Sequence, residues 1–326
     1  MSHVPATMTM DHSRLNFLEK LLTLGMWVVA GWLFLSIGWA ALAPDDPQAA
    51  VSLFARRSVL TMVLTAAGLA GVTAGLATVV GNRLLVDVGT FAACVGLIAA
   101  STRGGTSTYF ILSEGQDSAM TSARVARSFL LEAMVWSLVV PVLLLVSGIL
   151  SRRWVEGGSI RHALSAYQDM VGRGLPDASF TRTNRSAGLK HVAWTAGASL
   201  LAWFVLSADP FSRSVQHGQA IFVAAAAVCL GSYVAHRAAP VHSAAWSVMG
   251  ALLATWVGYA CAMFATASAT LPTAIPASRF LRVLPIQSVF AGVAAAILMG
   301  WYYVVVSGAS EVKRTTASPP TARQPR

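Results

Sequence analysis

Two acidic residues lie inside apolar stretches of the sequence, where a charge is costly enough to indicate either a function or a dedicated partner. Asp87 lies about one turn into the third stretch and Glu132 about one turn into the fourth. Consecutive membrane helices run in opposite directions, so the two carboxylates belong to opposite faces and cannot act as a paired acid and base. One functional interpretation is that the two carboxylates form the two ends of a relay across the membrane. We favour the structural alternative, in which Asp87 caps its own helix or pairs with Arg83, and Glu132 pairs with Arg127 or Arg124.

Three histidines lie at the expected ends of apolar segments. His191 starts the fifth segment, His236 ends the sixth and His242 starts the seventh. Neutral imidazole is a common metal ligand, so a metal or a haem is one interpretation. No two of these histidines share a helix at i, i+4 spacing, and none lies at the depth of a membrane haem. We therefore expect interfacial side chains, and we predict no cofactor and no metal site.

A polar segment after the third apolar stretch is the last candidate site. It begins with Arg103, Gly104 and Gly105 and continues with threonine, serine and tyrosine. Two glycines beside an arginine can hold an anion or line a vestibule, and an ordinary loop is the alternative that we favour. The sequence has no P-loop, no GxGxxG and no HExxH pattern. Without such a motif, the sequence identifies no catalytic residue.

The elements that position these residues are eight long apolar runs. Each is about the length that a helix needs to cross a bilayer, and a membrane segment of this length satisfies its backbone hydrogen bonds only as a helix. Hydrophobic residues make up 56% of the chain and charged residues 11%, which excludes a water-soluble domain. The sequence predicts an all-α, polytopic integral membrane protein. The eight runs are Leu21–Leu42, Val59–Val80, Leu84–Ala100, Phe129–Leu150, Val192–Ala208, Gly218–Ala235, Ala244–Ala265 and Ile286–Val306.

The distribution of lysine and arginine predicts the orientation. With eight crossings, fifteen of these residues fall on the side of both termini and eight on the other side. The positive-inside rule then places the N- and C-termini in the cytoplasm, for a multi-pass protein of the cell membrane. The net charge of +10 is dispersed over the loops, so we expect no nucleic-acid partner. The orientation depends on the third run crossing the membrane.

The runs fall into two sets of four with recurring landmarks. The first helix carries Trp32–Ser36 and the fifth carries the similar Trp203–Ser207, while the fourth and eighth end on Val146–Gly148 and Val306–Gly308. A parallel repeat is one interpretation, and shared composition is the other. Five segments are expected: a cytoplasmic segment 1–20, a membrane half 21–150, a cytoplasmic linker 151–190 with an amphipathic helix, a second half 191–308 and a disordered cytoplasmic tail 309–326.

Small residues every four positions predict which helices pack closely, because close backbone approach stabilises helix pairs in lipid. The seventh helix has such a stripe from Gly250 to Ala262, and the eighth has one from Gly292 to Gly300. The second helix has Ala67, Gly71 and Gly75. We expect these three helices to be the buried ones.

The functional prediction follows from the scarcity of charge inside the membrane. We expect a non-enzymatic protein, either a structural subunit or a carrier-like component of a membrane assembly. Its partners would be the lipid bilayer, and other membrane subunits or further copies of itself. The alternative is a membrane enzyme or redox subunit that acts on a lipid or quinone through the histidines and Asp87 at the cytoplasmic rim.

Overall fold

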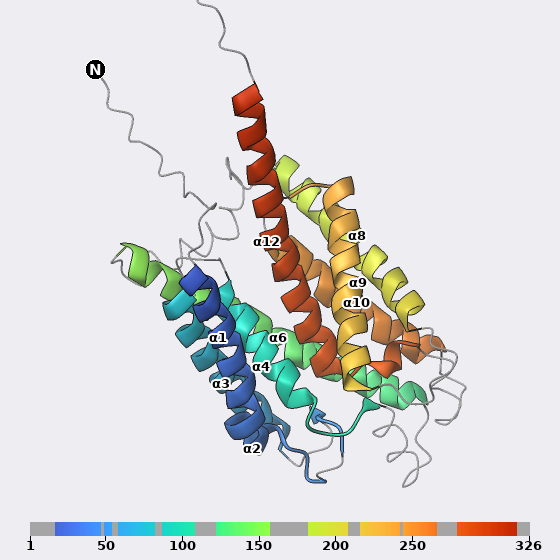
Figure 1. Cartoon of the computed structure of the whole chain (residues 1–326). Coiled ribbons are helices and arrows are strands. Elements are labelled where there is room, and N and C mark those ends of the chain that lie inside the picture. Colours follow the sequence, from blue (N-terminus) through green and yellow to red (C-terminus); the bar gives the residue numbers. More distant parts are fainter. Residues whose placement is uncertain are drawn as a thin grey trace, which may run out of the picture.

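The computed structural model of the chain is a bundle of helices (Figure 1). Among the residues that it describes, the backbone is helical apart from short connections and an isolated bridge between Ala50 and Gly105. The all-α prediction is therefore confirmed. The described residues are 17–46, 49–53, 58–81, 87–107, 122–156, 182–207, 216–241, 244–265 and 279–317.

The described residues of the first half form four helices. The first of them is continuous from α1 through η2 to α2, and η2 is a π-helical turn around the buried Phe34. The ring of Phe34 occupies the space that a side chain at Gly96 would need, since a Cβ there would lie 2.3 Å from the ring. The elements are α1 (Phe17–Leu33), η2 (Phe34–Gly38), α2 (Trp39–Leu42), α3 (Val59–Gly81), α4 (Val88–Ser101) and α6 (Ser122–Glu156).

The part of the second half that the structure describes forms four more helices, with a short 3-10 turn before the last of them. In Figure 1, α1, α3 and α4 lie on one side, α8, α9 and α10 on the other, and α12 between them. The elements are α8 (Arg182–Leu206), α9 (His217–Ala238), α10 (Ala244–Ala265), η4 (Arg279–Arg282) and α12 (Pro285–Ala317).

Seven of the described helices are long and apolar enough to cross a membrane. Their exposed faces carry large apolar side chains such as Leu60, Leu138 and Phe222, which suit contact with lipid tails. A water-soluble protein does not expose apolar residues on this scale. The chain is a multi-pass membrane protein.

The helix formed by the third apolar run is shorter than the sequence predicts. This helix, α4, has fourteen residues and a length of about 21 Å, less than the roughly 30 Å of a hydrocarbon core. Almost every residue of α4 is buried among α1, α3, α6 and α12. Thr90 in its first turn contacts Ser147 near the end of α6, and Gly105 beyond its last turn pairs with Ala50 before α3. The helix therefore runs from one end of the first half toward the other while enclosed by protein.

The two halves meet through their third and fourth helices. α6 of the first half packs on α10, and α12 of the second half packs on α4. α6 and α12 also pack on each other. Exchanging the two halves maps the α6–α10 contact onto the α12–α4 contact and the α6–α12 contact onto itself, because α4 and α10 are the third helices and α6 and α12 the fourth.

Small residues set the closest helix crossings. A Cβ at Gly231 of α9 would lie 2.0 Å from the Ser199 hydroxyl of α8, and one at Gly250 of α10 would lie 2.5 Å from Thr195. α10 and α12 are the most buried of the seven long apolar helices, as the small-residue stripes predict, but α3 is among the less buried ones. A Cβ at Gly71 would meet no atom within 4 Å, because α3 turns the neighbouring Ala70 toward the bundle instead.

Several boundaries differ from the predicted segments. α6 continues to Glu156 and α8 begins at Arg182, so both ends of the predicted linker 151–190 are helical. The predicted amphipathic helix in that linker lies outside the described residues. α12 continues to Ala317, where the sequence predicts a disordered tail from 309. An apolar run therefore marks the membrane-embedded part of a helix and not its ends, because polar residues extend a helix readily beyond lipid.

Candidate functional site

Glu132 of α6 is fully buried beside the segment that connects α2 to α3. The Ser52 hydroxyl donates to Glu132 Oε2 at 2.6 Å, and the Trp136 indole N–H donates to Oε1 at 3.1 Å. Trp136 lies one helical turn after Glu132, so α6 presents acceptor and donor on one face. The expected pairing with Arg124 or Arg127 is replaced by these two bonds, and both arginines are exposed. Both carboxyl oxygens are therefore used to hold neighbouring groups.

The Ser52 segment between α2 and α3 is buried although it is not helical. Ala50, Val51, Ser52 and Leu53 each have at most 1% of their surface exposed. The Gly105 N–H donates to the Ala49 carbonyl at 2.8 Å, which satisfies part of this backbone. Glu132 accepts from the Ser52 hydroxyl and from the Leu53 backbone, so these two bonds and the Gly105–Ala49 bond tie the loop into the bundle.

His217 connects this loop region to the second half. Its Nε2–H donates to the Gly104 carbonyl at 2.8 Å, and its Nδ1 accepts from the Gln287 amide at 2.8 Å. These partners assign the neutral tautomer with the proton on Nε2. His217 begins α9 and Gln287 lies in the first turn of α12, so one imidazole joins three segments that are far apart in sequence. His217 is not among the predicted site residues, although it stands at the start of an apolar run as His191 does.

Further polar contacts cross between the halves. The Trp256 indole of α10 donates to the Ser137 hydroxyl of α6 at 3.0 Å. The Ser107 hydroxyl donates to the Arg282 carbonyl at 2.7 Å. Together with the His217 contact, they form what we call the interhalf network, composed of Gly104, Ser107, Ser137, His217, Trp256, Arg282 and Gln287.

Aromatic rings fill the space beside this network. Trp136 packs edge-to-face on Phe290, with ring centroids 5.8 Å apart. Tyr259 is edge-on to Phe129 at 5.7 Å, and its hydroxyl donates to the Val283 carbonyl at 2.7 Å. Such pairs contribute about 0.5–1.5 kcal/mol beyond their area burial. The boundary between the halves is thus packed as a protein core.

The predicted Arg103-Gly104-Gly105 loop directs its polar groups to the protein itself. The Arg103 guanidinium donates to the Leu35 carbonyl and lies over the ring of Trp39, 5.1 Å from its centroid. A Cβ at Gly104 would lie 2.7 Å from the Ala49 carbonyl, so glycine is needed for this close approach. The Gly105 N–H is bonded to the Ala49 carbonyl at 2.8 Å, and the ordinary loop that we favour remains a prediction.

Asp87 lies just before α4 and far from Glu132 along the bundle. It adopts a left-handed conformation (φ 65°), and its side chain makes no capping hydrogen bond, so the predicted side-chain cap is wrong. The backbone carbonyl of Asp87 accepts from the Phe91 N–H instead. Burial raises the pKa of the Asp87 carboxyl to about 6. Arg83, its predicted partner, lies outside the described residues.

The predicted histidines occupy separate environments. His191 is buried, its Nδ1–H donates to the Ala239 carbonyl at 2.9 Å, and its Nε2 accepts from the Ser247 hydroxyl at 2.9 Å. His236 stacks on Tyr303, with ring centroids 3.6 Å apart. His242 lies outside the described residues. Within the part of the chain that the structure describes, no three metal-ligating side chains gather around one point.

No protein-family model matches the sequence, and comparisons with curated proteins and with solved structures find no match.

Proposed function

We propose that this multi-pass membrane protein is a non-enzymatic structural subunit of a membrane assembly. The observation that carries the proposal is the interhalf network, in which the buried polar side chains bind other segments of the same chain. Buried polar groups in a membrane are costly unless they are bonded, and here their partners are backbone carbonyls, hydroxyls and an amide. These groups are used to hold the bundle together.

The packing between the halves favours a rigid subunit over a carrier. A carrier that rocks one half against the other needs an interface that can separate around a central site. Here Trp136 of α6 packs on Phe290 of α12, so aromatic rings lie between the halves. The Phe129–Tyr259 ring pair and the Ser137–Trp256 hydrogen bond both join α6 to α10. Opening this boundary would expose several aromatic side chains and break hydrogen bonds together.

The arrangement of the helices supports a parallel repeat. The α6–α10 and α4–α12 contacts are equivalent under exchange of the halves, as a two-fold axis along the membrane normal requires. An arginine from the connection between the third and fourth helices also contacts the first helix of its own half in both halves. Arg103 donates to the carbonyl of Leu35 in η2, in the second half of the first helix, and Arg279 donates to that of Phe204 in the last turn of α8. We infer eight crossings, with α4 as a short and enclosed one, and with both termini in the cytoplasm.

The alternative, an enzyme built on rim histidines and Asp87, receives less support. Both ring nitrogens of His191 are engaged by Ala239 and Ser247, so a metal would have to displace one of these bonds. His236 is stacked on Tyr303 and belongs to a different helix end. A shared active site at this rim would need these rings to converge.

The size and composition of the particle test the proposal. The protein would be extracted from its native membrane in a mild detergent or a polymer nanodisc, and its mass measured by native mass spectrometry or mass photometry. We expect a defined particle heavier than one 34.2 kDa chain. Metal analysis and optical spectra of the same particle provide the second measurement.

Two results would contradict the proposal. One is a particle that contains a single copy of this chain and no other subunit at all detergent concentrations tested. The other is a stoichiometric metal or haem that His236→Ala removes while Leu253→Ala, a lipid-facing change on α10, leaves it in place. The second result would establish the rim-histidine alternative.

A further inference from the structure

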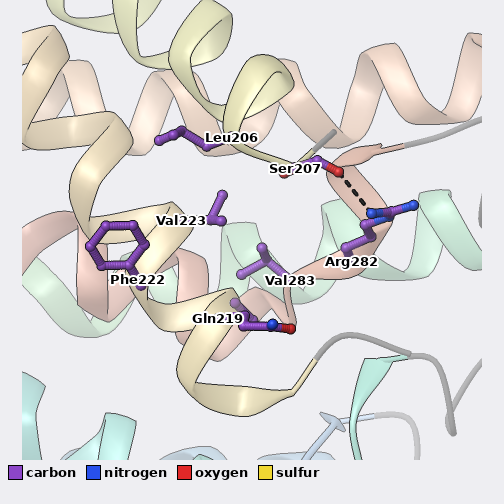
Figure 2. A pocket seen from close by; sticks show the side chains of 8 residues that line it. Leu206, Ser207, Gln219, Phe222, Val223, Arg282 and Val283 are labelled. Carbon is purple, nitrogen blue, oxygen red and sulfur yellow. Dashed lines mark hydrogen bonds between the residues drawn. The ribbon is translucent and has the colours of Figure 1, made fainter. Parts of the chain in front are cut away.

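A cavity of about 180 Å³ lies in the second half, where α8 ends and α9 begins. It is enclosed by the end of α8, the first turns of α9 and the segment around η4 (Figure 2). An apolar cavity of about 150 Å³ in another protein admits benzene, so this one has room for a small organic group but not for a whole lipid. Its lining residues are Leu206, Ser207, Gln219, Ala220, Phe222, Val223, Arg282 and Val283.

The position of the cavity corresponds to the edge of the hydrocarbon core. The membrane-crossing part of α8 ends at Leu206 and that of α9 begins at His217, so this end of both helices meets the interfacial region of the bilayer. Phe222 at the rim is 65% exposed, whereas Ala220 and Val283 on the wall are buried. The cavity is therefore reached sideways from the lipid, at the depth where headgroups give way to acyl chains.

Most of the cavity wall is apolar, and two of its three polar side chains are used by the protein itself. The Arg282 guanidinium donates to the Ser207 carbonyl at 2.8 Å, and Arg282 has a further interaction within the protein. The Gln219 amide oxygen accepts from the Gln216 N–H at 3.2 Å. An uncharged ligand would leave these bonds in place and would match the apolar wall.

The third polar side chain, that of Ser207, points to the kind of ligand. Only 5% of the residue is exposed, and its hydroxyl has no hydrogen-bond partner among the described residues. Leaving a buried donor unbonded is costly. The matching serine of the first half, Ser36, is satisfied because its hydroxyl donates to the Trp32 carbonyl at 2.7 Å. The wall of the cavity therefore offers one unused donor in an apolar surrounding.

We propose that this cavity binds an uncharged, apolar group that carries one hydrogen-bond acceptor, with a carbonyl as the best match. The carbonyl oxygen would accept from the Ser207 hydroxyl, and the apolar part would pack on Leu206, Phe222 and Val223. Two sources supply this chemistry in a membrane: the ester carbonyl of a lipid, which lies at this depth, and a small lipophilic ketone or ester. Binding here does not depend on the structural role proposed above.

Two uncharged probes of the same shape test the need for an acceptor. Acetophenone has a carbonyl oxygen where isopropenylbenzene has a methylene group. The full-length protein in detergent would be titrated with each probe at equal mole fraction in the micelle, and dissociation constants would be derived from the rise in unfolding temperature. We expect acetophenone to bind about fivefold to tenfold more tightly, because only it accepts from the Ser207 hydroxyl.

Variants assign this preference to Ser207 and to the cavity. Ser207→Ala removes the donor, so the dissociation constants of the two probes should then agree within about twofold. The matched control is Ser36→Ala, which should keep the full preference for acetophenone. Val223→Trp occupies the cavity and should abolish the binding of both probes, and Val223→Phe is the smaller replacement if the tryptophan variant does not fold.

Diester and diether phosphatidylcholine of equal chain length distinguish the two sources. The two lipids share one headgroup, and only the diester has carbonyl oxygens. If a lipid ester is the occupant, native mass spectrometry of the delipidated protein should show the diester bound about fivefold more tightly, and Ser207→Ala should remove this difference. Equal binding of the two lipids, with the preference for acetophenone retained, would identify a small lipophilic molecule as the occupant.

Contrary results would overturn the proposal. Equal binding of acetophenone and isopropenylbenzene to the parent would mean that Ser207 donates to no ligand. An equal loss of preference in Ser36→Ala and Ser207→Ala would place the acceptor elsewhere, and so would undiminished binding of both probes to a folded Val223→Trp protein. The mass and metal measurements that test the structural role are unaffected by any of these outcomes.

Discussion

The buried contact of Glu132 with Ser52 and Trp136 allows a quantitative prediction. In Glu132→Ala the buried Trp136 indole N–H loses its acceptor, which costs about 1–3 kcal/mol, and the lost bonds to the Ser52 hydroxyl and the Leu53 backbone contribute about 1 kcal/mol more. The lost side-chain volume of about 50 Å³ adds about 1 kcal/mol at the rate found for core cavities. Because the carboxyl no longer has to be buried, part of this is offset. We expect a net loss of about 3 kcal/mol.

Glu132→Gln is the matched comparison, because it keeps the shape of the side chain. The amide oxygen can accept from Trp136, and the amide N–H can donate to the Ser52 hydroxyl, which is able to accept. Both contacts survive with one donor and acceptor reversed. We therefore expect a loss of about 1 kcal/mol or less.

Thermal unfolding in detergent, followed by tryptophan fluorescence, measures both variants. A chain of 326 residues shifts by about 1.5 °C per kcal/mol, so Glu132→Ala should unfold about 4–5 °C lower and Glu132→Gln within about 2 °C of the parent. Met134→Ala, on the exposed face of the same helix, controls for truncation alone. A cysteine at Val51 should become reactive to a polar thiol reagent only in the Glu132→Ala background.

Two outcomes would refute this reasoning. If Glu132→Gln is as destabilising as Glu132→Ala, the charge of the carboxyl matters and not its hydrogen bonds. If Glu132→Ala is as stable as the parent, the contacts to Ser52 and Trp136 do not hold the loop.

Three further predictions follow from other contacts. Gly231→Ala should destabilise the protein by about 2 kcal/mol in the same assay, since its Cβ would collide with α8, while Gly197→Ala, with no atom within 4 Å, should be neutral or stabilising; equal effects would contradict the tight crossing. Because burial raises the pKa of Asp87, the folded state holds that proton more tightly, and stability should fall as the pH rises from about 4 to 6. Asp87→Asn should flatten this dependence, and an unchanged slope would show that another group causes it. His217→Ala and Gln287→Ala should show a coupling of about 1 kcal/mol in a double-mutant cycle, and strict additivity would mean that their 2.8 Å contact contributes nothing.

The sequence predicted the helices better than their faces. A run of apolar residues reports burial in lipid or protein without distinguishing the two, so the run around α4 was expected to be a full crossing like the others. In α3, Ala66 and Ala70 form one small-residue stripe, and Ala67 and Gly71 form another, one residue away. Which stripe meets the bundle depends on the rotation of the helix about its axis, and the neighbouring helices decide that rotation.

At the candidate site too, the sequence predicted some contacts and the fold alone decided the others. The presence of an acid in an apolar run was plain, and so was Trp136 one turn later on the same face of α6. The second partner, Ser52, is eighty residues away in a loop, so no local spacing could reveal it. By charge alone, the nearby Arg124 and Arg127 are better partners, but they lie on exposed positions of the helix.

By itself, the sequence determined that this chain spans a membrane as an all-α bundle, because composition and run length decide the solvent and lipid permits only helices among such segments. It also contained the repeated landmarks from which two halves were predicted. Only the tertiary structure decided which polar groups are bonded to one another. Ser36 and Ser207 occupy the same place in their landmarks, yet one hydroxyl is satisfied by its own helix and the other faces a cavity beside Arg282. That difference arises from helix geometry and neighbouring segments, which spacing along the chain does not encode.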